Sequence, residues 1–180
     1  MKILLTAVNS KYIHSNLAVY SLKAYHDAHS DRKDTVELAE YTINQLQEEI
    51  IKDIYKKQPD VLAFSCYIWN IELVKQLLPL VHRLLPNCKI ICGGPEVSYA
   101  TKEFMQDFPM VDFVVRGEGE KAFHDLLQAL LDEKNNGVVF NGIYSRDMSN
   151  IYAKPIENGM SKYKVTPEEQ EAINRAMVKI

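Results

Sequence analysis

Five short segments of the chain are apolar almost throughout and do not alternate between apolar and polar residues. They span residues 3–8, 36–41, 61–66, 89–92 and 112–115. Such runs are typical of strands that are covered on both faces. Consecutive runs begin 33, 25, 28 and 23 residues apart, which is the length of a strand plus a crossover helix. The pattern therefore predicts right-handed βαβ units in a parallel sheet.

Between these runs the apolar residues recur at helical spacing. In residues 71–85 they fall at steps of three and four, and Asn70 precedes them as a natural N-cap. Pro79 is expected to kink this helix or divide it. Further helices are expected from Ser15 or Asn16 to about Ala28, over residues 46–54, over residues 104–108 before Pro109, and over residues 123–130.

The pattern changes toward the C-terminal end. Residues 138–146 and 151–154 are expected to form the two strands of a hairpin. A last helix is expected from Thr166, because Glu169 follows at capping-box spacing and Pro167 occupies the first helical position. We therefore expect a main domain at residues 1–135, a hairpin extension at 136–154 and a tail with a helix at 155–180. This tail either packs on the domain or serves as a connector.

Composition places the chain among folded globular proteins. It has 180 residues, of which 47% are hydrophobic and 25% charged, so disorder of the whole chain is excluded. A net charge of −3 with no run of five like charges argues against a nucleic-acid phosphate footprint. No membrane span is expected, and residues 1–8 are interpreted as a first strand rather than a signal peptide. Cys66, Cys88 and Cys92 are too few for a disulfide framework, and we expect a cytoplasmic protein.

Four of the seven glycines follow predicted strands. Gly93 and Gly94 come after the fourth strand, and Gly117 and Gly119 come after the fifth. Ligands of open parallel sheets bind beyond the carboxyl ends of the strands. A glycine there either lets the backbone approach a ligand closely or forms a tight turn into a helix. The pattern leaves both interpretations open.

The other strand ends add polar and aromatic side chains. The loop at residues 9–16 holds no glycine, which excludes the dinucleotide-binding motif, and no P-loop occurs in the chain. The third strand runs into Ser65, Tyr67 and Trp69, which suit a flat organic ligand or pack against neighbouring helices. Glu118 and Glu120 stand at a predicted helix start, where negative charge is favourable. They could also bind a ligand hydroxyl or an adjoining domain.

Four of these segments together are more specific than any one of them. They are residues 9–16 (NSKYIHSN), 64–70 (FSCYIWN), 93–98 (GGPEVS) and 116–120 (RGEGE). In this arrangement residues 1–150 resemble the N-terminal cobalamin-binding domain of cobalamin-dependent radical S-adenosylmethionine enzymes. That family includes the anaerobic magnesium-protoporphyrin monomethyl ester cyclase and methyltransferase-like proteins. The resemblance implies an α/β, flavodoxin-like (Rossmann-like) three-layer sandwich with a parallel five-stranded sheet of order 2-1-3-4-5, followed by a C-terminal hairpin and helix.

The resemblance also implies a cofactor site at the carboxyl edge of the sheet. The corrin of a base-off cobalamin would lie over the first loop and the end of the third strand, and its nucleotide tail would pass beside Ser65, Gly93 and Gly94. His14 is what remains here of the D-x-H-x-x-G motif of many cobalamin proteins, which makes it a candidate cobalt ligand. The cofactor-binding residues expected on this basis are Asn9, Ser10, Tyr12, His14, Ser65, Tyr67, Trp69, Gly93, Gly94, Pro95, Glu96, Gly117 and Glu118.

No catalytic residue is predicted, because the chain presents no nucleophile–base pair. It also lacks the C-x-x-x-C-x-x-C motif on which the family's catalytic barrel holds a [4Fe–4S] cluster. The resemblance therefore implies that S-adenosylmethionine and the cluster belong to a separate catalytic domain, the expected partner, in the full-length protein or in trans. We expect the chain to hold a corrinoid for methyl transfer or radical chemistry on that domain. The alternatives are a flavodoxin-like docking module that has lost its cofactor and, less favoured by the missing motifs, an enzyme using another nucleotide or a flavin.

Overall fold

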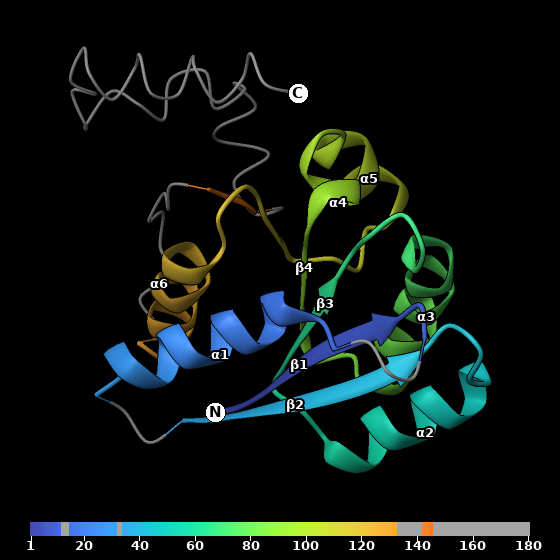
Figure 1. Cartoon of the computed structure of the whole chain (residues 1–180), viewed down its shortest axis with the longest axis horizontal. Helices are drawn as coiled ribbons and strands as arrows, with labels where there is room; N and C mark the ends of the chain where they lie inside the picture. Colours follow the sequence, from blue (N-terminus) through green and yellow to red (C-terminus); the bar gives the residue numbers. More distant parts are fainter. Residues whose placement is uncertain (12–14, 32–33, 133–141, 146–180) are drawn as a thin grey trace. The chain divides into compact units, whose positions relative to one another are not determined.

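A computed structural model describes residues 1–11, 15–31, 34–132 and 142–145 of the chain. These residues form one six-stranded sheet of order β2-β1-β3-β4-β5-β6, with helices on both faces (Figure 1). The strands are β1 (Lys2–Asn9), β2 (Thr35–Thr42), β3 (Val61–Ser65), β4 (Lys89–Gly93), β5 (Phe113–Val115) and β6 (Ile143–Ser145). The helices are α1 (Leu17–His29), α2 (Gln47–Lys57), α3 (Ile71–Leu84), α4 (Pro95–Ser98), α5 (Thr101–Asp107) and α6 (Glu120–Leu131).

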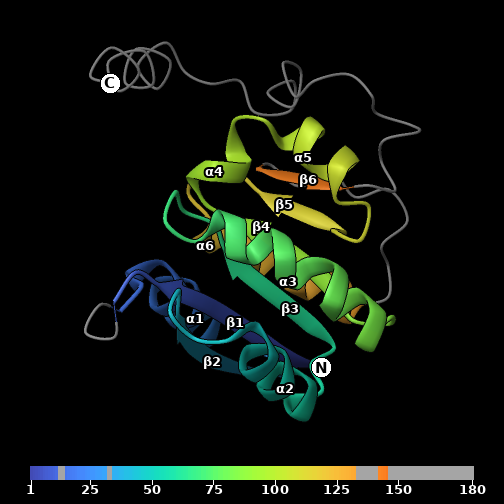
Figure 2. The same cartoon turned by 90° about the vertical axis from the view of Figure 1, so that its right-hand side faces the viewer.

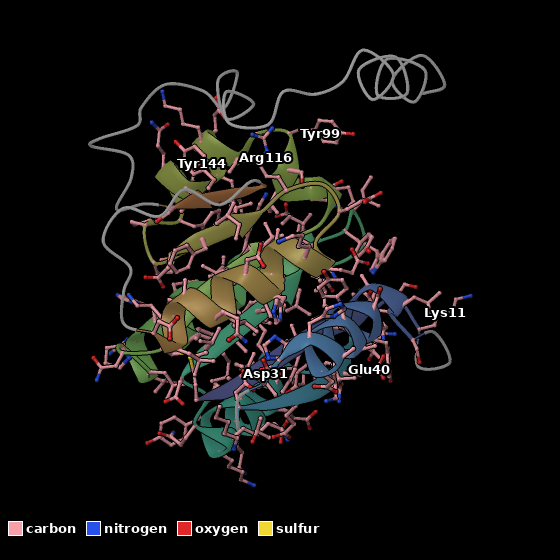
Figure 3. All side chains as sticks on the ribbon, turned by 90° about the vertical axis from the view of Figure 1, so that its left-hand side faces the viewer. Lys11, Asp31, Glu40, Tyr99, Arg116 and Tyr144 are labelled. Carbon is pink, nitrogen blue, oxygen red and sulfur yellow. The ribbon has the colours of Figure 1, made fainter. Side chains whose placement is uncertain are left out.

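The two faces of the sheet bury separate apolar cores, so the fold has three layers. One core joins β-strand residues such as Leu4, Leu62 and Ile90 to α2, α3, α4 and α5. The other joins the alternate strand residues, such as Ile3 and Ile91, to α1 and α6. Figure 2 shows α2 and α3 in front of the sheet, while Figure 3 looks onto the face that α1 and α6 cover. The central strands are apolar on both sides because both sides are covered.

The predicted sheet order is confirmed, with one strand added. β1 to β5 are parallel and follow the order 2-1-3-4-5. The expectation of five strands is wrong, because β6 pairs with β5 in the antiparallel sense and forms the edge of the same sheet. β6 lies within the first predicted hairpin strand, and it pairs with the sheet because Ile143 joins the core under α6. The second hairpin strand and the last helix lie outside the described residues.

The predicted helices are present, and one detail differs from expectation. α1 begins after Asn16, whose side-chain oxygen accepts a bond from the amide of Ala18, as an N-cap does. α3 is not divided at Pro79 but continues to Leu84 as one element. Asn70 stands at the start of α3 yet does not cap it with its side chain. That side chain is used at the strand ends instead.

All three cysteines are free and buried. A bond with Cys66, followed by burial, raises the pKa of the Cys92 thiol well above its ordinary value. Burial raises the pKa of Cys88 to about 12, with Asp112 adding to the effect. The thiols of Cys88 and Cys92 therefore stay protonated at neutral pH. None of the helices in the described part of the chain has the length and apolar character needed to cross a bilayer.

Candidate functional site at the carboxyl edge of the sheet

Side chains become small at the carboxyl edge of the three central strands, on the face that α1 and α6 cover. Ser65 of β3 lies opposite Gly93 of β4. On the other side of Ser65, Ala7 of β1 continues the row, because Leu5 lies opposite Ala63 and both strands advance two residues from there. We call Ala7, Ser65 and Gly93 the small-residue row. One step further inside, the same face carries Leu5, Ala63 and Ile91. The core under α1 and α6 therefore tapers where the strands end.

Ser65 is fixed by a residue from the first loop. The Nδ2 of Asn16 donates to the Ser65 Oγ over 2.7 Å, and both side chains are more than nine-tenths buried. Asn16 uses its other side-chain atom, Oδ1, to cap α1. One asparagine therefore joins the start of α1 to the end of β3.

Glu40 of β2 holds both ends of the first loop. It lies opposite Ala7 in the parallel register, at one end of the small-residue row. Its carboxylate accepts bonds from Asn9 Nδ2 at 3.0 Å and from the Tyr20 hydroxyl at 2.5 Å. Burial by itself raises the pKa of Glu40, but the bonds from Tyr20, Asn9 and the amide of Asn16 outweigh it, so the pKa lies below its ordinary value. A charged Glu40 thus anchors the loop at neutral pH.

The two neighbouring glycines after β4 have different surroundings. Gly94 has a φ of +107°, and a Cβ there would meet the backbone oxygen of Cys66 at 2.5 Å. Its lack of a side chain is therefore required by the close approach of the loop after β3. At Gly93 a Cβ would meet only Val115, at 3.4 and 3.6 Å, which is ordinary contact. Of the two open interpretations, Gly94 fits the tight turn and Gly93 leaves room at the small-residue row.

The aromatic residues after β3 stand together at the same edge. Tyr67 and Trp69 stack with ring centroids 4.5 Å apart, and the Trp69 Nε1 donates to the Val8 carbonyl at 3.3 Å. The fully buried Asn70 donates to the carbonyls of Val8 and Ser65, both at 2.9 Å, and accepts a bond from the Tyr67 amide. Trp69 remains half exposed and Ile68 is 77% exposed. The edge thus offers an apolar surface supported by a buried asparagine.

α1 and α6 lie side by side over the face that holds the small-residue row (Figure 3). Three polar pairs join the two segments: Ser21 with Glu120, His26 with His124, and Ser30 with Gln128. We call these pairs the α1–α6 seam. The bond from Ser21, first among several hydrogen bonds, lowers the pKa of Glu120. Leu22 also packs against Gly119, so the two helices are in direct contact above the sheet.

The predicted cofactor residues fall into three groups in the structure. Ser65 and Gly93 lie together in the small-residue row. Asn9 is linked to the end of this row because it donates to Glu40, which lies opposite Ala7. Exposed or half-buried positions around the same edge are held by Ser10, Tyr67, Trp69, Gly94, Pro95, Glu96, Gly117 and Glu118. Tyr12 and His14 lie outside the described residues, so cobalt ligation by His14 stays a prediction. Lys11 points away from the fold beside this loop (Figure 3).

Three residues of the site were not among the predicted ones: Asn16, Glu40 and Asn70. Asn16 and Asn70 are predicted as helix starts and end two of the segments that carry the resemblance. An asparagine directly after a strand-end loop is also suited to bridging backbone groups. Glu40 gave no signal of its own, because an acidic residue at the end of β2 is common at a sheet edge. In the described part of the chain no group of three His, Cys, Asp or Glu side chains is placed to hold a metal ion.

Two family models match parts of the chain. The family model of the B12 binding domain matches residues 3–127. A second model, for a family described as a protein of unknown function (DUF4446), matches residues 127–177. The residues of the carboxyl edge described above all lie within the first match.

Two curated relatives come from the class of enzyme that the sequence resembles. The cobalamin-dependent radical SAM methyltransferase TokK of Streptomyces tokunonensis is 37% identical over 89 residues, which is 49% of this chain. The anaerobic magnesium-protoporphyrin IX monomethyl ester cyclase of Cereibacter sphaeroides is 26% identical over 82 residues, or 46% of this chain. The matched part is 13% of the length of each relative.

The fold has a solved counterpart. The cobalamin-dependent S-adenosylmethionine radical enzyme OxsB, solved with aqua-cobalamin and S-adenosylmethionine bound, superimposes with a TM-score of 0.67. The two are 23% identical, and the match covers 82% of this chain and 21% of OxsB. At that identity the likeness concerns the fold, which is the flavodoxin-like arrangement predicted above. The family model of the B12 binding domain matches more than half of the residues. The chain therefore belongs to the B12 binding domain family, whose cofactor is cobalamin.

Proposed function

We propose that this chain holds a cobalamin in the base-off form at the carboxyl edge of its sheet, with the nucleotide tail over the small-residue row. When bound, the corrinoid would supply a cobalt centre that carries a methyl group or takes part in radical chemistry. The reacting groups would belong to a radical S-adenosylmethionine catalytic domain, in the same polypeptide or in trans. The relatives support this partner, because the matched part is a small fraction of each of them.

The small-residue row is the observation that carries the proposal. A tail that enters a three-layer fold needs a place where core side chains are missing, and Ala7, Ser65 and Gly93 supply it on three adjacent strands. The donor set also fits the group, because Ser65 brings a buried hydroxyl to an otherwise apolar floor. The stacked Tyr67 and Trp69 would give the flat corrin an apolar wall at the edge.

Reconstitution tests the proposal directly. Purified protein is mixed with hydroxocobalamin, desalted, and examined by visible absorption under aerobic and reducing conditions. Retained corrin absorbance is expected at close to one equivalent. Absence of retained corrinoid under both conditions would contradict the proposal and would favour the docking module that has lost its cofactor.

A variant at Gly93 tests where the tail lies. Gly93→Leu fills the small-residue row at a position where a first side-chain carbon fits without backbone strain, so the fold is expected to persist while retention is lost. Ala24→Leu introduces the same side chain on the exposed face of α1 and is the matched control. Full retention by a folded Gly93→Leu protein would refute this placement of the tail.

The proposed location is the cytoplasm, as expected for a partner of an iron–sulfur enzyme. All three thiols are free and buried, and such cysteines are typical of reducing compartments.

A further inference from the structure

The small-residue row lies under α1 and α6, and the two helices cover it in this structure. Ala7 is fully buried and Ser65 is 9% exposed. Ala7 belongs to the same core cluster as Val19 of α1 and Phe123 of α6. A nucleotide tail over the row therefore needs space that these helices now fill, and the helices have to part to release it.

The middle contact of the α1–α6 seam is a pair of histidines whose ring nitrogens face each other. The Nδ1 of His26 lies 3.2 Å from the Nδ1 of His124. The other ring nitrogen of His26, Nε2, lies 2.8 Å from the Asp34 carboxylate, and both of these side chains are buried. Because a carboxylate accepts, Nε2 of His26 donates to it. The two Nδ1 atoms then form a hydrogen bond only while one of them carries a proton and the other does not.

This bond fails when both rings are positively charged. Each Nδ1 then carries a proton, the two N–H groups point at each other, and the two charges repel. A second proton at this contact therefore works against the closed arrangement of α1 and α6.

The groups around His124 come from three segments. They are Tyr25, His26 and His29 on α1, Lys121 and Asp125 on α6, and Asp34, which reaches the pair through His26. Burial and then His26 lower the pKa of His124, with His29 and Lys121 acting in the same direction. Asp125 opposes them, but it also forms an ion pair with Lys121 at 2.5 Å. The closed seam therefore keeps His124 neutral at neutral pH.

We propose that the α1–α6 seam is a proton-linked gate for the cofactor: entry of the nucleotide tail separates His26 from His124, and His124 takes up a proton. This inference rests on the proposed function, because it takes the tail to lie over the small-residue row. In the parted seam His124 meets water and titrates near its ordinary pKa of 6.5. Binding then raises the pKa of His124, so the affinity for cobalamin increases as the pH falls below about 6.5.

Calorimetric titration of the full chain with hydroxocobalamin, in two buffers of different ionisation enthalpy, counts the protons taken up on binding. At pH 6 the uptake by His124 is expected to be about 0.3 to 0.8 proton per cofactor, and at pH 8 close to zero. The same proton should increase the affinity by up to about fourfold between pH 8 and pH 6. Failure of hydroxocobalamin to bind at both pH values would overturn the proposed function and this inference with it.

Two variants isolate the part of the uptake that belongs to the seam. In His124→Asn the amide can still donate to the Nδ1 of His26 but does not titrate, so this part of the uptake should be lost. His82→Asn, at an exposed histidine of α3 on the other side of the sheet, is the matched control and should keep it. The cofactor's own titration contributes equally to all three proteins and cancels in the difference. Equal uptake by the unaltered chain and His124→Asn would overturn the inference and leave the proposed function intact.

A second measurement needs no variant that folds. The NMR signals of the His124 ring, followed over a pH series, give its pKa in the free chain and in the complex. The pKa should rise when cobalamin binds, and a pKa that stays the same or falls would refute the gate. Cobinamide, which lacks the nucleotide tail, should bind without this rise, and an equal rise would refute the role given to the tail.

Discussion

Asparagines carry much of the structure at the ends of β1 and β3. Asn16 joins the first loop to Ser65, and Asn70 binds the carbonyls of Val8 and Ser65 while accepting from the Tyr67 amide. Both side chains are buried, so each bond satisfies a backbone or hydroxyl group that water cannot reach. These residues therefore fix the positions of three strand-end segments relative to one another.

Replacing Asn70 should destabilise the whole domain. Asn70→Ala leaves the Tyr67 amide and the Ser65 carbonyl without their side-chain partner, for an expected loss of about 2 to 4 kcal/mol in the free energy of unfolding. Urea unfolding followed by circular dichroism measures this loss. Asn87→Ala, at an exposed asparagine, is the control and should change the free energy by less than about 0.5 kcal/mol. Equal stability of the two variants would contradict the role given to Asn70.

The paired glycines should respond differently to the same small change. Gly94→Ala forces a Cβ into the Cys66 backbone at a positive φ, so we expect a loss of at least about 1 kcal/mol. Gly93→Ala meets only ordinary contacts and should be neutral within about 0.5 kcal/mol, or slightly stabilising. Thermal unfolding of the two proteins side by side measures the difference, and a larger loss at Gly93 would reverse the assignment.

At the level of elements, the α1–α6 seam joins two helices through polar side chains. His26 and Asp34 form a buried pair at 2.8 Å, and the Nδ1 of His124 lies 3.2 Å from that of His26. Burial and then the charge of His26 lower the pKa of His124, with His29 and Lys121 acting in the same direction and Asp125 opposing. The seam therefore favours a neutral His124.

The free energy of unfolding should consequently fall as the pH is lowered past the ordinary pKa of His124. The unfolded chain takes up a proton at His124 near pH 6.5, whereas the folded chain takes it up only at lower pH. Unfolding then binds protons, so the free energy of unfolding decreases from about pH 6.5 downward. Urea unfolding at several pH values measures the slope, and His124→Gln should reduce it. An unchanged slope in that variant would show that other groups cause the pH dependence.

The elements could be predicted from sequence to the extent that each depends on its own residues. The buried strands read as continuous apolar runs, and the helices as three-and-four spacing, because those patterns follow from local burial. For β6 the sequence predicts a hairpin strand, since a short apolar strand gives no sign of which neighbour it pairs with. The roles of Asn16 and Glu40 could not be predicted for a related reason. Their partners, Ser65 and Asn9, lie 49 and 31 residues away along the chain.

For the whole molecule, cofactor binding should appear as added stability. A ligand that binds only the folded state raises the free energy of unfolding by about 2.7 kcal/mol at a concentration one hundred times its dissociation constant. For a chain of this size that corresponds to roughly 5 to 10 °C in melting temperature. Thermal unfolding with increasing hydroxocobalamin measures the rise. Gly93→Leu should show none, and an equal rise in that variant would indicate binding elsewhere on the molecule.

The loops after β3 and β4 behave as a single unit. The Cys66 amide donates to the Gly93 carbonyl, the Glu96 amide donates back to the Cys66 carbonyl, and Gly94 fits against the same peptide. A shift of either loop would therefore require the other to move with it. If cobalamin binds as proposed, the adjustment at this edge would fall to α1 and the described ends of the first loop. Side-chain bonds hold these to Ser65 and Glu40, and the α1–α6 seam holds α1 to α6. On the proposed function, the loops after β3 and β4 are therefore already in place for the corrinoid, and the first loop and α1 are the part that binding would rearrange.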